Sequence, residues 1–589
     1  MHNLTGAPTP YLSFRGHYWL TLLRFFLAHL NHSNMLKSLA LPSQGVKNIR
    51  YVTLNPRFSD DYWLQISKLV RFEYGVGKLT DPAVVRQALD DIYALLVENF
   101  ERVATASSSV GFLMFVHRMH ESSVLISNLF HSGSTEIEAQ LSAQDLKELP
   151  NTRRVLKLIM EAVLKEQFAE DINEQVVGEA LVNPQNVARL EELLYLGGHA
   201  LEIKEYINIC SLYEKSVALQ SSWKNRLVIL LKSPYNHVFD TVQRDIASYR
   251  NNAYEGINEE LDDSLQANFG SNLTHFLQGL PGLGTFIVPR EQWIEEQVAA
   301  DKQDDARPFY AGLTLTAANK MALADSFQKM QSNTRLIYRP IIEFQDKTGN
   351  PYWIVGSGKA YESMHALQTN ALLWGHLPNE WKTNAAMREF AKGLESRREN
   401  LMIDQIAGIL VERGVPHDTN LKRLLNLKGQ AFNIATTGLG EIDIIFLNEA
   451  DKVIYVGECK NNRPRFDVFY WKGEQRQFAE GYETKLARKH AWVSEHKQQV
   501  QDHFNHKFNT EFDFSDWTVQ AVFFLMTASI YKYDGAFLVL TVKDISEFLD
   551  NGFQYRYPFL EFRRKDRTTY EVHYPYFKNL HRMAEEGII

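Results

Sequence analysis

The sequence predicts a multidomain protein, in which a mainly helical N-terminal region precedes a C-terminal α/β domain. The chain has 589 residues, more than one hydrophobic core organises, so two or more domains are expected. Up to roughly residue 330, apolar residues recur at helical spacing, whereas short apolar runs alternate with helical stretches beyond it. We therefore expect a helical region over 1–330, with room for two subdomains, a β-hairpin and connector over 331–380, and an α/β domain over 381–589.

The helical part is best marked by the stretch from Asp81 to Ala104. Asp81 is a good N-cap, proline follows at the first helical position, and apolar residues recur every three or four positions. Residues 151–172 and 183–219 continue this pattern, whereas the polar segment 250–272 predicts a loop. The apolar run 18–30 is too short for a membrane span and is interrupted by Arg24 and His29, so we expect a buried amphipathic helix.

The C-terminal part reads as a helix, three strands, a helical stretch, two strands and a helix. A hairpin around Asp346–Asn350 and one long helix over 385–414 come before the strands. The late strands are fully apolar, which is typical of strands inside a sheet covered on both faces. The elements expected after the long helix are strands over 429–437, 440–447, 452–459, 518–527 and 536–542, helices over 470–492 and 494–505, and a last helix over 543–552.

Composition limits the classes of partner and compartment. The formal net charge is −8, so a nucleic-acid partner would need a local basic surface. The two cysteines, Cys210 and Cys459, argue against a disulfide framework and a structural zinc site, and favour a reducing, cytoplasmic location. No basic segment precedes an apolar run at the N-terminus, so we expect neither a secretory signal nor a membrane partner.

The segment from Gly440 to Asn462 places carboxylates in strands that otherwise suit a core. Because strand side chains alternate, Asp443 shares a face with Glu441, and Glu458 shares a face with Lys460. If the two strands pair, Asp443 and Glu458 approach each other. Two adjoining carboxylates repel, and a divalent cation such as Mg²⁺ or Mn²⁺ would relieve that repulsion. Lys460 could orient or deprotonate water and stabilise charge on a phosphate. The alternative is a surface hairpin with a solvated charged end.

This arrangement resembles the PD-(D/E)xK, or restriction-endonuclease-like, nuclease superfamily. Asp443 matches the first acid, and Glu458-Cys459-Lys460 matches the acid-x-lysine triplet, while Ile442 stands in place of the proline. The resemblance covers roughly residues 383–552. It implies an αβββαβ core with a central mixed sheet, metal ligation by Asp443, Glu458 and the Cys459 carbonyl, and Lys460 as the catalytic lysine.

Further site residues follow from branches of the same superfamily. Many members carry a glutamate on the helix before the sheet, which implies Glu399, with Glu395 one helical turn away as the alternative. Other branches place glutamine and tyrosine on the helix after the lysine. Gln475 is our candidate there, with Gln477 and Tyr482 beside it.

The resemblance implies a Mg²⁺-dependent endonuclease that hydrolyses phosphodiester bonds, with DNA as the preferred polymer. A helical module fused to such a nuclease is similar to the layout of bacterial anti-phage effectors and restriction enzymes, so the N-terminal region would bind a substrate, a partner, a signal or a second copy of the chain. Three alternatives stay open: a repair or recombination nuclease, an RNA-directed nuclease, and a scaffold or nucleic-acid-binding protein on an inactive nuclease fold.

Several weaker patterns complete the sequence reading. Residues 355–361, VGSGKAY, lack the first glycine and the final serine or threonine of a phosphate-binding loop, and predict a strand-to-helix turn. His117 and His120 have metal-pair spacing without a third ligand, and Arg24–His29 fits a loose R-x4-H ribonuclease pattern that arises often by chance. Basic residues that suit phosphate contacts are Lys472, Arg476, Lys485, Arg488, Lys489, Arg563, Arg564, Lys565 and Arg567.

Overall fold

The computed structural model describes most of the chain. The described residues are 36–41, 46–52, 59–172, 183–224, 226–248, 257–280, 282, 284–434, 438–557, 559–563 and 568–588. The predicted helix over 18–30 and the R-x4-H pattern within it lie outside the described residues. None of the helices described is long and apolar enough to cross a membrane.

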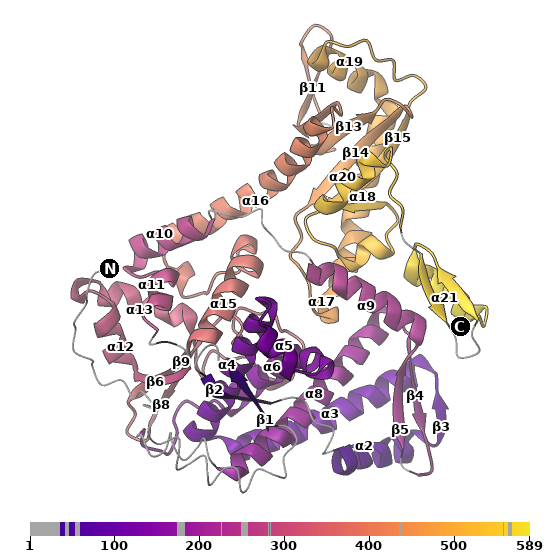
Figure 1. Ribbon diagram of the computed structural model, residues 1–589. Coiled ribbons are helices and arrows are strands. Elements are labelled where there is room, and N and C mark those ends of the chain that lie inside the picture. The colour runs from indigo at the N-terminus through magenta and orange to yellow at the C-terminus, as the bar shows by residue number, and fades with distance from the viewer. Residues whose placement is uncertain are drawn as a thin grey trace. The chain divides into compact units, whose positions relative to one another are not determined.

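Helices and strands both contribute, which confirms the predicted multidomain mixture of helical and α/β parts (Figure 1). The chain divides into two units. Unit 1 comprises Met1–Ile207, Leu219–Val228 and Tyr254–Ala391, and unit 2 comprises Asn208–Ala218, Ile229–Ala253 and Lys392–Ile589. The predicted hairpin segment 331–380 belongs to unit 1. The functional division into three regions stays a prediction.

Unit 1 is built mainly from helices. The longer ones are α2 (Ser59–Tyr74), α3 (Pro82–Ser107), α4 (Val110–His131), α6 (Ala143–Val163), α8 (Pro184–Leu212, which continues into unit 2), α10 (Ile257–Phe269), α13 (Gln303–Leu313) and α15 (Ser357–Asn370). The shorter ones are α5 (Thr135–Gln140), α11 (Leu273–Gln278), α12 (Arg290–Gln297) and α14 (Leu323–Ser326).

Three small sheets lie wholly or partly in this unit. β1 (Leu36–Leu41) pairs with β2 (Val46–Val52), and the order β3-β4-β5 joins Gly77–Leu79, Val217–Ser221 and Leu227–Leu231. The order β6-β9-β8-β7 joins Thr285–Pro289, Pro351–Gly356, Ile341–Gln345 and Thr314–Leu315. The predicted hairpin around Asp346–Asn350 is therefore confirmed as β8 and β9.

Helix α3 shows why the first predicted helix forms. The Asp81 carboxylate accepts hydrogen bonds from the N–H groups of Ala83 and Val84, which the helix itself leaves unsatisfied. Pro82 occupies the first turn, where its missing N–H costs nothing. The buried face follows the apolar spacing of the sequence and consists of Val85, Ala88, Leu89, Ile92, Leu96, Phe100, Val103, Ala104 and Ser107.

The prediction of a loop over 250–272 is wrong, because Ile257–Phe269 forms helix α10. Its charged residues hide an apolar stripe. Leu261, Leu265 and Phe269 follow one another at intervals of four, and all three are at most 3% exposed. This spacing places them on one helix face, where burial outweighs the polar composition of the rest.

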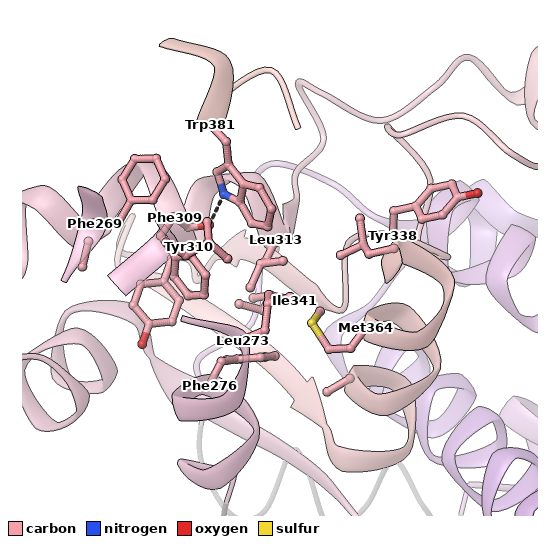
Figure 2. Close-up of a cluster of buried hydrophobic side chains, with 14 of the residues drawn as sticks. Phe269, Leu273, Phe276, Phe309, Tyr310, Leu313, Tyr338, Ile341, Met364 and Trp381 are labelled. Atoms are coloured by element: carbon pink, nitrogen blue, oxygen red, sulfur yellow. Dashed lines mark hydrogen bonds between the residues drawn. The ribbon is translucent and has the colours of Figure 1, made fainter. Parts of the chain in front are cut away.

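An aromatic cluster in unit 1 is shown in Figure 2. The ring of Trp381 stacks on that of Phe309 at 5.8 Å between centroids, and its indole N–H donates to the Phe309 carbonyl at 3.0 Å. This close approach requires Gly312 on the facing helix α13. A Cβ at Gly312 would lie 2.2 Å from the indole nitrogen.

Gly312→Ala is therefore expected to destabilise the protein by about 1–3 kcal/mol, because Trp381 would have to leave its hydrogen bond and its stacked position. Gly393→Ala is the matched control. Gly393 lies on helix α16 (Ala385–Glu412), and a Cβ there would meet nothing within 4 Å, so alanine should be neutral or stabilise by up to about 1 kcal/mol. Urea unfolding of both variants measures the difference, and equal midpoints would contradict this packing account.

Unit 2 contains a five-stranded mixed sheet of order β10-β13-β14-β15-β16. The strands are His417–Leu421, Ile442–Asn448, Val453–Lys460, Thr518–Leu525 and Leu538–Thr541. β10 and β14 both pair antiparallel with β13, whereas β15 runs parallel to β14 and β16 runs parallel to β15. The predicted strand pair around the turn at Asn448 and the two late apolar strands are thus confirmed.

One predicted strand is in the wrong sheet. The sequence predicts residues 429–437 as the first strand of the central sheet, but Ala431–Asn433 is β12, which pairs with β11 (Arg423–Leu425) in a separate two-stranded sheet. The edge strand next to β13 is β10, a mostly polar segment that sequence patterning does not reveal. The other edge strand is β16, which is apolar.

Helices cover both faces of this sheet (Figure 1). After β14 come α17 (Val468–Gln477), a single π-helical turn (Phe478–Tyr482), α18 (Glu483–Glu495) and α19 (Lys497–Phe508). Val493, Val500 and Phe504 of α18 and α19 pack in one buried cluster with Ile445 of β13 and Val456 of β14. On the opposite face, Phe548 of α20 (Val542–Asp550) meets Tyr455 of β14 edge to face. The remaining elements are α9 (Ser233–Ser248), β17 (Leu560–Arg563), β18 (Thr569–Val572) and α21 (Tyr576–Glu585).

Candidate active site

Strand register brings the two predicted carboxylates together. Ile444 of β13 pairs with Gly457 of β14, so the preceding Asp443 and the following Glu458 lie on adjacent strands and on one face of the sheet. Both side chains are withdrawn from solvent, with 18% of Asp443 and 4% of Glu458 exposed. The structure thus assembles the acid pair that the sequence predicts.

Lys460 and Cys459 complete the predicted triplet. The Lys460 ammonium lies 2.6 Å from a Glu458 oxygen and 4.8 Å from the ring centroid of Tyr482. The backbone N–H of Cys459 donates to Asp443 Oδ2 at 2.7 Å, which fixes the orientation of that carboxylate. The acid pair and the lysine therefore form one hydrogen-bonded group.

Lys489 of α18 is part of the same group, although the sequence suggests only a phosphate contact for it. Its ammonium lies 3.2 Å from Asp443 Oδ1 and also pairs with Glu458 Oε2, and its side chain is 7% exposed. A helix more than twenty residues beyond the hairpin brings it there, so spacing within the hairpin gives no signal for it.

Burial and charge act differently on the two acids. Burial, followed by the nearby Glu458 charge, raises the pKa of Asp443 above its ordinary value. Burial also opposes ionisation of Glu458, but the ammonium groups of Lys460 and Lys489 outweigh it and lower the pKa of Glu458. The carboxylates in turn outweigh burial at Lys460 and raise its pKa, so this lysine is a cation at neutral pH.

A cavity of about 830 Å³ opens beside this group. Asp443, Cys459 and Lys460 contribute to its wall, and Glu441 lies at the same cavity, 3.4 Å from Lys422. The other cationic side chains of the wall are Arg398, Arg463 and Arg465. With Lys422 and Lys460 the wall carries five cationic side chains against the three carboxyl groups of Glu441, Asp443 and Glu474. This excess of cations favours an anionic ligand despite the negative net charge of the chain.

The helix after β14 places Gln477 and Tyr482 at the cavity. Both line it, and the Gln477 amide donates to the Tyr482 hydroxyl at 2.5 Å. The π-helical turn from Phe478 to Tyr482 adds a residue between them, which explains why their sequence spacing is irregular. Gln475 lies elsewhere: its amide contacts the Tyr213 hydroxyl at 3.5 Å, and it lines a second cavity.

The two candidate glutamates of helix α16 are not brought to the carboxylate pair by any contact described. Glu395 is 62% exposed and lies 3.8 Å from Arg398. Glu399 lies on the same helix, and its side chain is outside the described residues. Arg398 and Asn400 are the residues of this part of α16 that line the cavity, together with Met402 and Ile403.

Glu474 of α17 is a cavity residue that the sequence does not single out. Its Oε1 accepts a hydrogen bond from the Asn462 amide at 3.1 Å, and the described residues offer its buried Oε2 no hydrogen-bond partner. Burial raises the pKa of Glu474 to about 7, against the weaker opposing effects of Asn462 and Arg465. A carboxyl group that titrates near neutral pH thus faces the same cavity as Lys460.

Glu474→Gln is expected to change the pH dependence of stability. The folded-state pKa of about 7 exceeds the ordinary value of 4.5, so the stability that the neutral carboxyl gives below pH 4.5 is lost as pH rises through 7. Glutamine does not ionise, so the variant avoids this loss. The difference in unfolding free energy between the variant and wild type should therefore be about 1–2 kcal/mol more favourable to the variant at pH 8 than at pH 4.5. Urea unfolding at both pH values measures it. Glu480→Gln, at a side chain 74% exposed, should show no such gain.

The other patterns have structural explanations within unit 1. The predicted strand-to-helix turn is confirmed, since β9 ends at Gly356 and α15 begins at Ser357. The Glu121 carboxylate accepts the N–H groups of Gly358 and Lys359, both at 2.7 Å, so a side chain of the protein satisfies this helix start. The nearby His117 and His120 are fully buried, with Nδ1 of His117 on Thr285 and Nε2 of His120 3.4 Å from Glu362.

The predicted basic run near the C-terminus is only partly described. Arg563 ends β17, and residues 564–567 lie outside the described residues.

Among the described residues, no group of three or more histidine, cysteine, aspartate or glutamate side chains is arranged to hold a metal ion. No protein-family model matches the chain, and no curated protein or solved structure matches it either.

Proposed function

We propose that unit 2 is a divalent-metal-dependent nuclease that hydrolyses phosphodiester bonds, with DNA as its substrate. The observation that carries this proposal is the pairing of the Asp443 and Glu458 carboxylates on adjacent strands, with Lys460 beside them at a cationic cavity. Helix α16, strands β10, β13 and β14, the helices α17–α19 and strand β15 also follow the αβββαβ order of a restriction-endonuclease-like core.

The donor set fits Mg²⁺ or Mn²⁺. Asp443 and Glu458 supply two hard carboxylates, and the carbonyl of Cys459, a cavity residue, is the proposed third ligand. Two carboxylates are few for a site made of protein ligands alone. They are usual for Mg²⁺, which keeps water and binds substrate phosphates at its other positions. When bound, such an ion polarises the phosphate and activates water.

The chain's own residues would position and neutralise the substrate. In the metal-free site the carboxylates raise the pKa of Lys460, and its ammonium would place positive charge beside the phosphate. Tyr482 holds the Lys460 ammonium over its ring, and Gln477 holds the Tyr482 hydroxyl. The cationic wall of the cavity would bind further phosphates of the chain being cut.

One observation favours a second candidate function. Lys489 pairs with both carboxylates and Lys460 pairs with Glu458, so two ammonium groups balance the two negative charges. The group could thus be a closed ion-pair network in a non-catalytic nucleic-acid-binding or scaffold protein. Repair and RNA-directed nucleases share the proposed chemistry and differ from the main proposal in substrate. A role as an anti-phage or restriction effector in the cytoplasm, with unit 1 as the sensing or assembly part, is our proposal from architecture alone.

The test is incubation of the purified protein with plasmid DNA, linear duplex DNA, single-stranded DNA and RNA, each with Mg²⁺, Mn²⁺ or EDTA. The proposal expects cleavage of DNA that requires the cation. Cleavage of RNA alone would assign the RNA-directed alternative, and a preference for single-stranded DNA in the same assay would favour the repair alternative. Binding of DNA without cleavage under any of these conditions would favour the non-catalytic alternative.

A further inference from the structure

Lys489 occupies a position where the helix pattern calls for an apolar residue. It lies three residues after Leu486 and four before Val493, so the three side chains share one face of α18. Leu486 and Val493 are fully buried, and Lys489 is 5% exposed. The apolar neighbours fix this helix face against the sheet, which directs the lysine stem towards the carboxylate pair.

A buried ammonium is tolerated only where anions compensate for its lost hydration. Its described ion-pair partners are Asp443 and Glu458, which it contacts through one oxygen of each. Conversely, the two adjacent carboxylates need a cation between them. Lys489 therefore supplies, from within the chain, the positive charge that a metal ion would supply.

Lys460 is placed differently. It pairs with Glu458 on the other oxygen, is 22% exposed, and lies over the Tyr482 ring at the cavity. Its described ion pair joins it to Glu458 alone, so it does not bridge the two acids. Lys489 contacts one oxygen of each carboxylate, which is the arrangement that a divalent ion shared by the pair would need, whereas Lys460 contacts the other oxygen of Glu458. A shared divalent ion could thus leave Lys460 in place but would compete with the Lys489 ammonium.

We propose that Lys489 is the resident cation of the Asp443–Glu458 pair, and that a divalent ion binds there only by displacing its ammonium. This inference rests on the proposed metal-dependent function. The ion pairs keep the acid pair assembled without metal and weaken its affinity for metal, so the free cation binds weakly and the substrate phosphate helps it to outcompete the lysine.

The test is calorimetric titration of Mn²⁺ into the full-length protein without nucleic acid, for wild type, Lys489→Met and Lys489→Gln. Far-UV circular dichroism checks that each variant folds. Lys489→Gln is used for the comparison if Lys489→Met does not fold. Lys460→Met is the matched control. It removes one positive charge next to the same Glu458, but the ammonium that joins the two carboxylates stays in place.

We expect the Lys489 variants to bind Mn²⁺ at least about tenfold more tightly than wild type, and Lys460→Met to bind within about threefold of it. The Lys489 variants should also melt below wild type in EDTA and gain more from saturating Mn²⁺. Two results would overturn the proposed role of Lys489 but leave the metal site intact. One is equal Mn²⁺ affinity in wild type and the Lys489 variants, and the other is a gain in Mn²⁺ affinity in Lys460→Met as large as in the Lys489 variants. Absence of binding in every protein would overturn the proposed metal site with it.

Discussion

Lys460→Met is expected to lower the rate of DNA cleavage by about 100- to 1,000-fold while Mn²⁺ binding stays within about threefold of wild type. The Lys460 side chain lies at the cavity wall, where its positive charge would meet the charge that develops on the phosphate. Methionine keeps the length and apolar character of the stem but removes this charge. Single-turnover cleavage with saturating Mn²⁺ measures the effect on chemistry apart from product release.

Lys422→Met is the control for that experiment. Lys422 lines the same cavity, but 69% of its side chain is exposed, and it pairs with Glu441 rather than with the acid pair. Its loss should weaken substrate binding at low salt and change the single-turnover rate by less than about tenfold. Similar rate losses in both variants would mean that general cavity charge, and not the position of Lys460, supports the reaction.

Glu161→Ala is expected to destabilise the protein by about 3–5 kcal/mol, the largest stability effect that we predict. The Glu161 carboxylate accepts Arg335 Nε and the N–H of Leu336, both at 2.9 Å. Arg335 is 2% exposed, so alanine at 161 leaves a buried guanidinium without its compensating anion. Chemical unfolding, followed by circular dichroism, gives the change in free energy.

The matched control for Glu161 is an exposed ion pair of unit 1. Lys302 and Asp305 lie 3.4 Å apart and are both more than half exposed, so Asp305→Ala should change stability by less than about 0.5 kcal/mol. A loss at Glu161→Ala no greater than the loss at Asp305→Ala would show that Arg335 finds other compensation, and the buried pair would not be essential to this unit.

The carboxylate pair could be predicted from sequence because it depends on local geometry. Strand alternation and the turn at Asn448 decide which residues of β13 and β14 face each other, and both are readable within twenty residues. Lys489 and Glu474 could not be found that way. Lys489 reaches the acid pair because Leu486 and Val493 pack its helix against the sheet, and no spacing rule links either residue to the hairpin.

Two other differences have specific physical causes. Gln475 and Gln477 lie two positions apart on α17, so they point to different sides of the helix, and Gln477 rather than Gln475 lines the cavity. Sequence spacing alone does not show which of these sides faces the acid pair. The edge strand β10 escapes sequence patterning because its residues, His417–Leu421, are mostly polar, whereas the other edge strand, β16, is apolar and is predicted. The apolar face of α10 is hidden by the charged residues between Leu261 and Phe269.

Cleavage of a labelled DNA duplex by wild type and Asp443→Asn, side by side in Mg²⁺ and in EDTA, tests the central claim most directly. Asparagine keeps the size of the side chain and an oxygen for the Cys459 N–H, but removes the charge that a cation needs. The account predicts cleavage by wild type in Mg²⁺ and none by wild type in EDTA or by the variant in Mg²⁺. Equal Mg²⁺-dependent cleavage by wild type and Asp443→Asn would contradict it.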